Sequence, residues 1–306
     1  MQQRIISLIL LLTLSLIWGS SFILMKLGMY DSNGGIVFTS NQVAAFRMLL
    51  ASSIFLPFAF KFRKSIRQKK DVLFLFIVGM CGSFIPAFLF THAETTINSG
   101  LAGMLNSFTP IFTIIIGIVI FKQRLIGREI LGILIGLIGV SLLVFFGKND
   151  SHEARYSHIL MVILATLCYA ISLSIIKYRL NHLHSIAITT ISLSFIWPLS
   201  FIVILSSDTI DVFHNNSHAS SSFFYIFILA LFSTTIATLL FNQLIKISSA
   251  VFASSVTYIM PIVAVVWGII YKEKISSVQI ICMITILIGV LIINFNIKKK
   301  AQNLPN

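Results

Sequence analysis

Apolar residues follow one another in long runs along this chain, and short polar links separate the runs. A helix needs about 20 mostly apolar residues to cross the hydrocarbon core of a bilayer, and ten runs reach that length. The pattern therefore predicts ten transmembrane helices, at residues 5–27, 39–60, 72–91, 98–121, 127–146, 158–177, 186–206, 222–244, 249–271 and 276–296.

The second half of this pattern repeats the first. The string NSFTPIFTIIIGIVIFKQRL in the fourth run is matched by SVTYIMPIVAVVWGIIYKEKI in the ninth, and GILIGLIGV is matched by ITILIGV. Pro110 corresponds to Pro261, 151 residues later, and after one deleted residue Lys122 corresponds to Lys272. Two such halves in a membrane protein are typical of a transporter built from repeats.

Composition excludes a soluble domain. The chain has 306 residues, of which 57% are hydrophobic and 10% charged, and its mean hydropathy is +0.99. A soluble domain of this size cannot bury so much apolar surface. The three cysteines, Cys81, Cys168 and Cys282, all lie inside apolar runs without metal-ligand spacing, so we interpret them as packing residues. We expect no cofactor, no bound metal and no catalytic residues.

The positive charge is distributed unevenly between the links. The net charge is +13, which in a soluble protein would suggest a nucleic-acid partner; here it indicates membrane topology. If the amino terminus is cytoplasmic, the cytoplasmic segments hold 16 of the 22 Lys and Arg residues and the outer segments hold 5. This asymmetry predicts that both termini are cytoplasmic. The basic block KFRKSIRQKK, residues 61–70, makes the largest contribution to this asymmetry. It is either a topology anchor or a binding site for anionic lipid headgroups.

The predicted fold class is an all-α integral membrane protein with ten transmembrane helices in two five-helix repeats. Because five is odd, the second repeat enters the membrane from the opposite side and the repeats are inverted. The predicted domains are residues 1–148 and 156–297, followed by a basic cytoplasmic tail at 298–306. Gly132, Gly136 and Gly139 form a stripe typical of close helix packing, either within a half or at the face of a homodimer.

The repeated strings resemble the EamA-type members of the drug/metabolite transporter superfamily. The opening LIWGSSFILMKLG and the stretch AAFRMLLA resemble that family too, so the resemblance covers about residues 5–296. The second copy departs from the pattern, with Cys282 and Ile286 where the first has Gly132 and Gly136. The resemblance implies ten helices, alternating access and a central cavity lined by helices 1, 3 and 4 and their repeat mates 6, 8 and 9.

Polar groups inside the predicted helices are candidate site residues, because in lipid each must find a partner or line water. The matched prolines free backbone carbonyl groups near Asn106 and Thr257, which can face a substrate. Core packing, helix kinks and hydrogen bonds between helices are the alternative roles for all these residues. The candidate cavity-lining residues are Trp18, Ser21, Asn106, Pro110, Tyr169, Ser172, Thr257, Tyr258 and Pro261.

Three further residues are candidates for coupling or gating. Arg47 lies inside the second predicted helix, where a charge is costly unless it snorkels or finds a partner. Of the nine acidic residues only Glu94, beside His92 at the outer end of the third helix, can approach the cavity. Transport is then either facilitated diffusion or exchange, or it is proton-coupled through Glu94 or His92.

The sequence thus predicts a secondary transporter, independent of ATP, that moves a small organic metabolite across the cell membrane by alternating access. An amino-acid-like solute is favoured by elimination, because cationic drugs call for a buried acid and phosphorylated sugars for several buried bases. Efflux or exchange is the expected mode, and a bacterial inner membrane is the expected location. Its partners are then the solute, the bilayer and, as an option, a second copy of the chain, without nucleic acid. The alternatives are an integral-membrane enzyme and a channel or scaffold without carrier activity.

Overall fold

The computed structural model describes residues 2–66, 68–122, 152–248, 250–254, 256–273 and 276–294, together with isolated positions between 127 and 142. In these residues the regular secondary structure is helical. The helices of the first half are α1 (Gln2–Met29), α2 (Ser40–Phe62), α3 (Lys69–Gly79), α4 (Ile85–Ala93), α5 (Ser99–Asn106) and α6 (Thr109–Val119).

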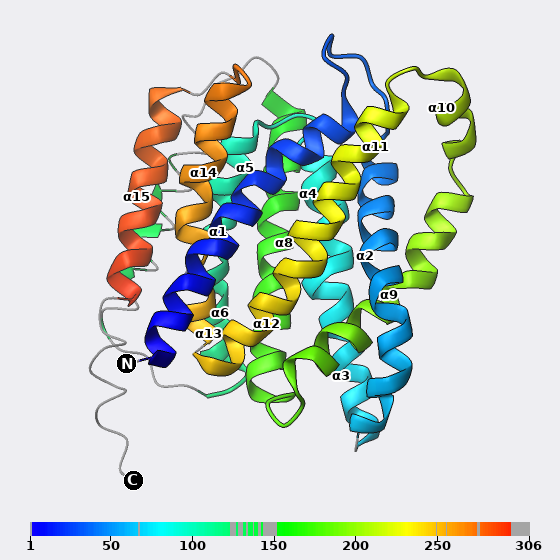
Figure 1. Ribbon diagram of the computed structural model, residues 1–306. Helices are drawn as coiled ribbons and strands as arrows, with labels where there is room; N and C mark the ends of the chain where they lie inside the picture. Colours follow the sequence, from blue (N-terminus) through cyan, green and yellow to red (C-terminus); the bar gives the residue numbers. More distant parts are fainter. Residues whose placement is uncertain are drawn as a thin grey trace.

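The second half follows the same order. Its helices are α8 (His152–Tyr178), α9 (Ser185–Leu205), α10 (Thr209–Asn215), α11 (Ala219–Ile228), α12 (Ala237–Ile247), α13 (Ala250–Ser254), α14 (Val256–Ile270) and α15 (Ser277–Asn294). Figure 1 shows them as a single bundle in which α1 begins and α15 ends at the same face, while α10 lies at the opposite face. We call these the amino-terminal face and the opposite face.

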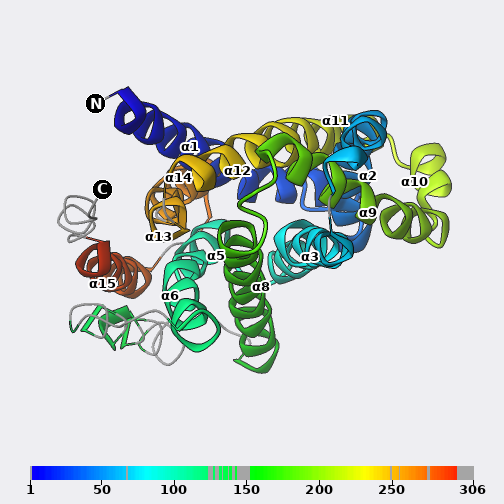
Figure 2. The same cartoon turned by 90° about the horizontal axis from the view of Figure 1, so that it is seen from below.

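Helices of the two halves pack on one another. α2 packs along α9, α1 along α14, α5 along α14, and both α4 and α6 along α8. The view along the bundle in Figure 2 shows this interleaving, with α12 and α8 between elements of the first half. At Gly289 in α15, a Cβ atom would lie only 2.6 Å from the backbone nitrogen of Gly136. Gly132 and Gly136 of the glycine stripe therefore pack closely on the second half, a contact that differs from the two expected ones.

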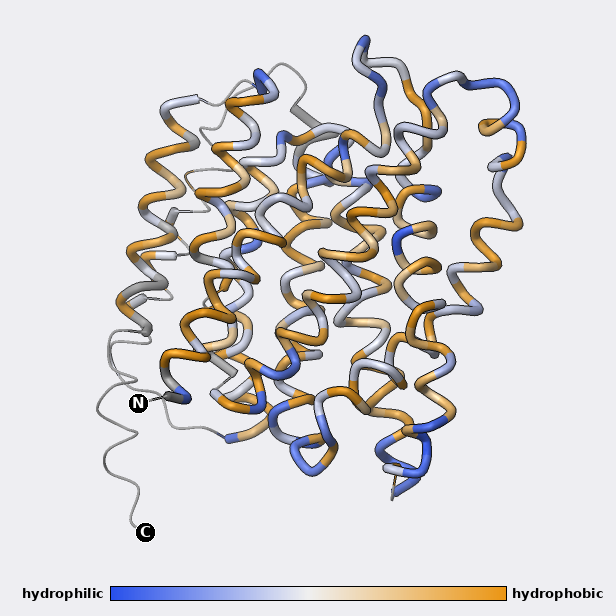
Figure 3. Tube along the Cα trace, viewed as in Figure 1, coloured by the Kyte–Doolittle hydropathy of each residue, from blue (hydrophilic) through white to orange (hydrophobic). Residues whose placement is uncertain are grey.

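Within the described residues, eight helices are long and apolar enough to cross a membrane. They match eight of the predicted spans, at residues 5–29, 40–65, 69–93, 99–119, 156–178, 185–205, 219–247 and 252–270. The predicted fifth span lies largely outside the described residues, and the 298–306 tail lies wholly outside them. In the region of the predicted tenth span, α15 carries a shorter apolar helix over Ile280–Gly289. Figure 3 shows the apolar stretches along the bundle and hydrophilic links at both faces. The total of ten spans stays a prediction.

Two of the spans contain a wide π-helical turn at matching positions. One turn, Met80–Phe84, lies between α3 and α4, and the other, Leu229–Ile236, lies between α11 and α12. The repeat offset of 151 residues places Gly82 on Ser233. Such turns interrupt regular helical hydrogen bonding and frequently occur at functional sites.

Candidate functional site

A central cavity lies between the two halves of the bundle. Helices α1 to α6 contribute side chains to it from the first half, and α8, α9 and α12 to α14 contribute from the second. The space open to the centres of water-sized molecules is about 90 Å³, whereas one water needs about 10–15 Å³. The cavity therefore has room for a small solute. The helices expected from the resemblance line it, and α2 and α9 do so as well.

Two aromatic pairs join the two halves at the cavity. In each pair, one ring comes from each half. Trp18 meets Phe241 edge-on with ring centroids 4.8 Å apart, and Tyr169 stacks on Phe90 at 5.9 Å. The offset of 151 residues relates Trp18 to Tyr169 and Phe90 to Phe241, so the two pairs are repeat equivalents. Trp18 Nε1 also donates to the Ser233 carbonyl at 2.8 Å, on the π-helical turn. Each half thus supplies one ring to each pair.

Six of the predicted lining residues lie at the cavity: Trp18, Ser21, Asn106, Tyr169, Ser172 and Thr257. Pro110 and Pro261 are buried, but neither belongs to the described lining. The side chain of Tyr258 lies outside the part of the chain that the structure describes.

Each carbonyl group freed by a proline accepts a hydrogen bond from a hydroxyl group. Thr109 Oγ1 donates to the Asn106 carbonyl at 2.9 Å. Pro261 cannot donate to the Thr257 carbonyl one turn earlier, and Ser107 Oγ from the other half donates to it instead, at 2.8 Å. Near Pro261 the hydroxyl donor therefore joins the two halves, whereas near Pro110 it comes from the same half.

Arg47 is a lining residue, although the sequence suggested it only for coupling or gating. Its side chain is 7% exposed. Nε donates to Thr234 Oγ1 at 2.8 Å, and Nη1 lies 3.7 Å from the sulfur of Met25. Both neighbours also line the cavity and are electrically neutral.

Glu94 and His92 differ in exposure although they are two residues apart in sequence. His92 is exposed, bonds Ser40 through Nδ1 and stacks on His158. Glu94, just beyond α4, is 2% exposed, and neither carboxylate oxygen has a hydrogen-bond partner in the described structure. Burial raises the pKa of Glu94 well above its ordinary range, against the lowering effect of the nearby Lys26 charge. Neither Glu94 nor His92 is among the described cavity-lining residues.

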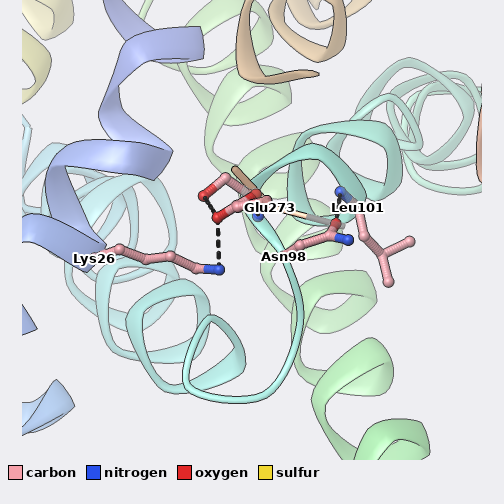
Figure 4. A network of polar contacts seen from close by, with 5 residues as sticks. Lys26, Asn98, Leu101 and Glu273 are labelled. Carbon is pink, nitrogen blue, oxygen red and sulfur yellow. Dashed lines mark hydrogen bonds and ion pairs between the residues drawn. The ribbon is translucent and has the colours of Figure 1, made fainter. Parts of the chain in front are cut away.

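An ion pair joins the two halves at the opposite face. Lys26 Nζ at the end of α1 lies 2.7 Å from Glu273 Oε1, in the link after α14. Ser99, the first residue of α5, donates to both carboxylate oxygens of Glu273, each at 2.9 Å, through its backbone N–H and its hydroxyl. Figure 4 shows this network beside Asn98, whose side chain accepts from the Leu101 N–H and so caps α5. No sequence motif singles out Glu273 as a partner of Lys26.

The amino-terminal face is joined in another way. Lys177, the repeat equivalent of Lys26, donates to the carbonyl groups of Ile245 and Ser248. Lys246 donates to the Leu180 carbonyl at 2.8 Å. Lysines therefore hold the cavity-forming helices together at both faces, but with different acceptors.

These features define a membrane protein whose helices from two repeats enclose a solute-sized cavity. The EamA-like transporter family model matches residues 5–145 and 156–295. The chain therefore belongs to the EamA-like transporter family and is a membrane transporter.

The curated relatives are distant in sequence. The chain is 25% identical over 265 residues to the uncharacterized transporter YetK of Bacillus subtilis, covering 84% of this chain and 78% of YetK. It is 27% identical over 158 residues to a probable amino-acid metabolite efflux pump of Escherichia coli, a match that spans about half of each protein, 51% and 49%. A solved crystal structure shares the fold, with a TM-score of 0.66 and 14% identity, over 97% of this chain and 99% of that one.

Proposed function

We propose that this transporter is a secondary carrier that moves a small organic metabolite by alternating access through the central cavity. The observation that carries the proposal is the placement of the two aromatic pairs, because each pair joins one half to the other across the same cavity. A rocking motion of one half against the other changes both pairs and can open the cavity at one face while closing it at the other.

In this proposal the amino-terminal face is cytoplasmic, as the distribution of basic residues predicts. Opening toward the outside breaks the contact of Lys26 with Glu273, and opening toward the cytoplasm breaks the contacts of Lys177 with Ile245 and Ser248. Reporter tags fused to the two ends of the chain test the orientation. Both tags are expected on the cytoplasmic side, and tags on different sides contradict the inverted-repeat topology.

An amino-acid-like solute and the direction of efflux or exchange are the favoured details. The half-length similarity to a probable amino-acid metabolite efflux pump supports them. The lining supports them too, because its aromatic rings and the amides of Asn106 and Asn242 suit a solute with an apolar part and a polar end.

Coupling to protons, if present, is assigned to Glu94. It is a buried carboxyl group, and the charges of Lys26 and Arg47 both act on its protonation. His92 is exposed and is the weaker candidate of the two. Exchange of one solute for another without proton movement is the alternative.

Counterflow in vesicles containing the purified protein tests the carrier function. Vesicles loaded with unlabelled solute are expected to accumulate the labelled solute transiently, across a panel of amino acids and related metabolites. Leu16→Ala, on the outer surface of α1 where the side chain is 58% exposed, is the control that should keep full activity. No counterflow for any solute class contradicts the proposal, as do single-channel currents or turnover of lipid.

A further inference from the structure

We propose that Arg47 anchors a carboxylate group of the transported solute. This inference rests on the proposed carrier function and gives its substrate a chemical class. Arg47 is almost fully buried and its guanidinium group lines the cavity in which the solute would bind.

Among the residues that the structure describes, Arg47 forms no ion pair with a carboxylate. In the described part of the chain the ion pairs are Lys26 with Glu273 and Asp71 with His182. Glu94 is near enough to act on Arg47 through its charge, yet neither of its oxygens accepts a hydrogen bond from a described residue. Arg47 is also the one formally charged side chain among the described lining residues. A buried, unpaired cation is costly in a membrane, and such residues usually belong to a substrate path.

The hydrogen bonds of Arg47 leave its donor fork available. Nε binds the Thr234 hydroxyl, and Nη1 binds the Met25 thioether, which is a weak acceptor. Nη2 has no acceptor in the described structure. A carboxylate accepts two parallel N–H bonds from a guanidinium group and is a much stronger acceptor than a thioether sulfur. An incoming carboxylate can therefore replace Met25 at Nη1 and also use Nη2, because neither nitrogen is bonded to an acid in the described structure.

Arg47 also makes the cavity asymmetric. Thr39 caps α2 and His184 caps α9, and the eighth residue after each cap is Arg47 in α2 and Ser192 in α9. Both line the cavity, but only one carries a charge. The solute therefore has one preferred orientation, with its anionic end toward α2.

The remaining walls indicate the rest of the solute. Tyr169 on Phe90, near Arg47, presents an aromatic surface to its apolar part. The described lining has no acidic side chain to hold an ammonium group. We therefore infer an organic monocarboxylate with an apolar or aromatic body, in which the carboxylate is essential and an amino group is dispensable.

Binding of matched acids and amides by the purified protein tests this inference. The probes are phenylpyruvate, phenylalanine, phenylalaninamide and phenethylamine, and the readouts are quenching of tryptophan fluorescence and counterflow in vesicles. The two acids are expected to bind about tenfold or more tightly than the amide and the amine, because they alone can use the guanidinium fork. Equal binding of acid and amide overturns the anchor.

Variants assign the effect to Arg47. Arg47→Gln should lower the affinity for the acids about tenfold or more and leave the weak binding of the amide unchanged, whereas Arg47→Lys should keep part of the preference for acids. Arg179→Gln, at the amino-terminal face beside Phe121, is the matched control and should change nothing. Unchanged acid binding in Arg47→Gln overturns the proposal.

The acid–amide comparison on the wild-type protein decides the question even if the Arg47 variants do not fold. Counterflow that does not distinguish acids from amides overturns the anchor and leaves the carrier function standing. The absence of counterflow for every solute overturns the carrier function itself.

Discussion

Lys26 and Lys177 occupy equivalent positions in the two repeats but bind different acceptors. Lys26 pairs with the carboxylate of Glu273 at one face, and Lys177 donates to the backbone carbonyl groups of Ile245 and Ser248 at the other. Backbone acceptors are present whatever residues surround them, whereas the Glu273 pair depends on one side chain. The contact at the opposite face is thus the one that a substitution of either partner removes, whereas only a substitution of Lys177 removes the other.

Charge exchange tests that contact. Lys26→Glu and Glu273→Lys should each slow counterflow and lower the melting temperature, and the double variant should recover much of both, because it restores an ion pair of opposite polarity. The two side chains are 22% and 11% exposed, so the coupling free energy should be about 1 kcal/mol. Lys272→Gln, at the exposed neighbouring residue, is the control. A double variant no better than the worse single variant contradicts the pairing.

The buried carboxyl group of Glu94 should make stability depend on pH. Burial raises the pKa of Glu94 in the folded protein. The positive charges of Lys26 and Arg47 lower this pKa, and the negative charge of Glu273 raises it further. The charge of Glu94 in turn acts on Tyr30. The unfolded chain loses the proton near the ordinary value of 4.5, so the folded state becomes less stable as pH rises from there toward the raised value.

Melting temperatures of the wild type and Glu94→Gln, measured against pH, test this expectation. The two proteins should differ by a constant amount below about pH 4, and the variant should become relatively more stable as the pH rises. In vesicles, Glu94→Gln should abolish any proton flux that accompanies the solute. A pH-independent difference in melting temperature contradicts the raised pKa.

Ser107 and Pro261 should be energetically coupled. Ser107→Ala leaves the Thr257 carbonyl without its hydroxyl donor and should cost about 1–3 kcal/mol of unfolding free energy. In the Pro261→Ala background the same change should cost less, because the substituted residue regains a backbone N–H that can bond the Thr257 carbonyl. Ser206→Ala, on an exposed side chain, is the control. Equal costs of Ser107→Ala in both backgrounds would falsify the assignment.

The aromatic pairs should matter for transport more than for folding. Trp18→Ala removes both the ring contact with Phe241 and the hydrogen bond to Ser233, whereas Trp18→Phe removes only the hydrogen bond. Counterflow should fall severalfold in the second variant, since a hydrogen bond is worth about 0.5–1.5 kcal/mol. It should fall further in the first variant, which also loses an aromatic contact worth about 0.5–1.5 kcal/mol. Trp197→Phe removes a similar hydrogen bond, to Ser53, away from the cavity and should leave counterflow unchanged.

Periodicity and the repeat located much of this architecture from sequence. Eight of the predicted spans match membrane-length helices. The matched positions of Trp18 and Tyr169 suggested from sequence alone that both line the cavity, and both do. Their partners Phe90 and Phe241 were not distinguished among 27 phenylalanines, because composition says nothing about which face of a helix a ring occupies. The common offset of 151 residues was the signal that could have found them.

Contacts between segments that are distant in the chain could not be predicted from the sequence pattern. Glu94 and His92 were grouped because they are neighbours in the chain, yet residues two apart near the end of a helix point to opposite sides. The hydroxyl of Ser107 that binds the carbonyl near Pro261 comes from the other half, so no local pattern reveals it. The same holds for the pairing of Lys26 with Glu273.

The most direct test of the central claim is the accessibility of one cavity position from the two sides of the membrane. Thr238, a half-buried lining residue on α12, is replaced by cysteine in a variant without Cys81, Cys168 and Cys282, and oriented vesicles are treated with an impermeant maleimide on one side at a time. Alternating access predicts labelling from each side, with a transported solute protecting the cysteine in both cases. Labelling from one side only, with or without solute, would contradict a cavity shared by two alternating openings.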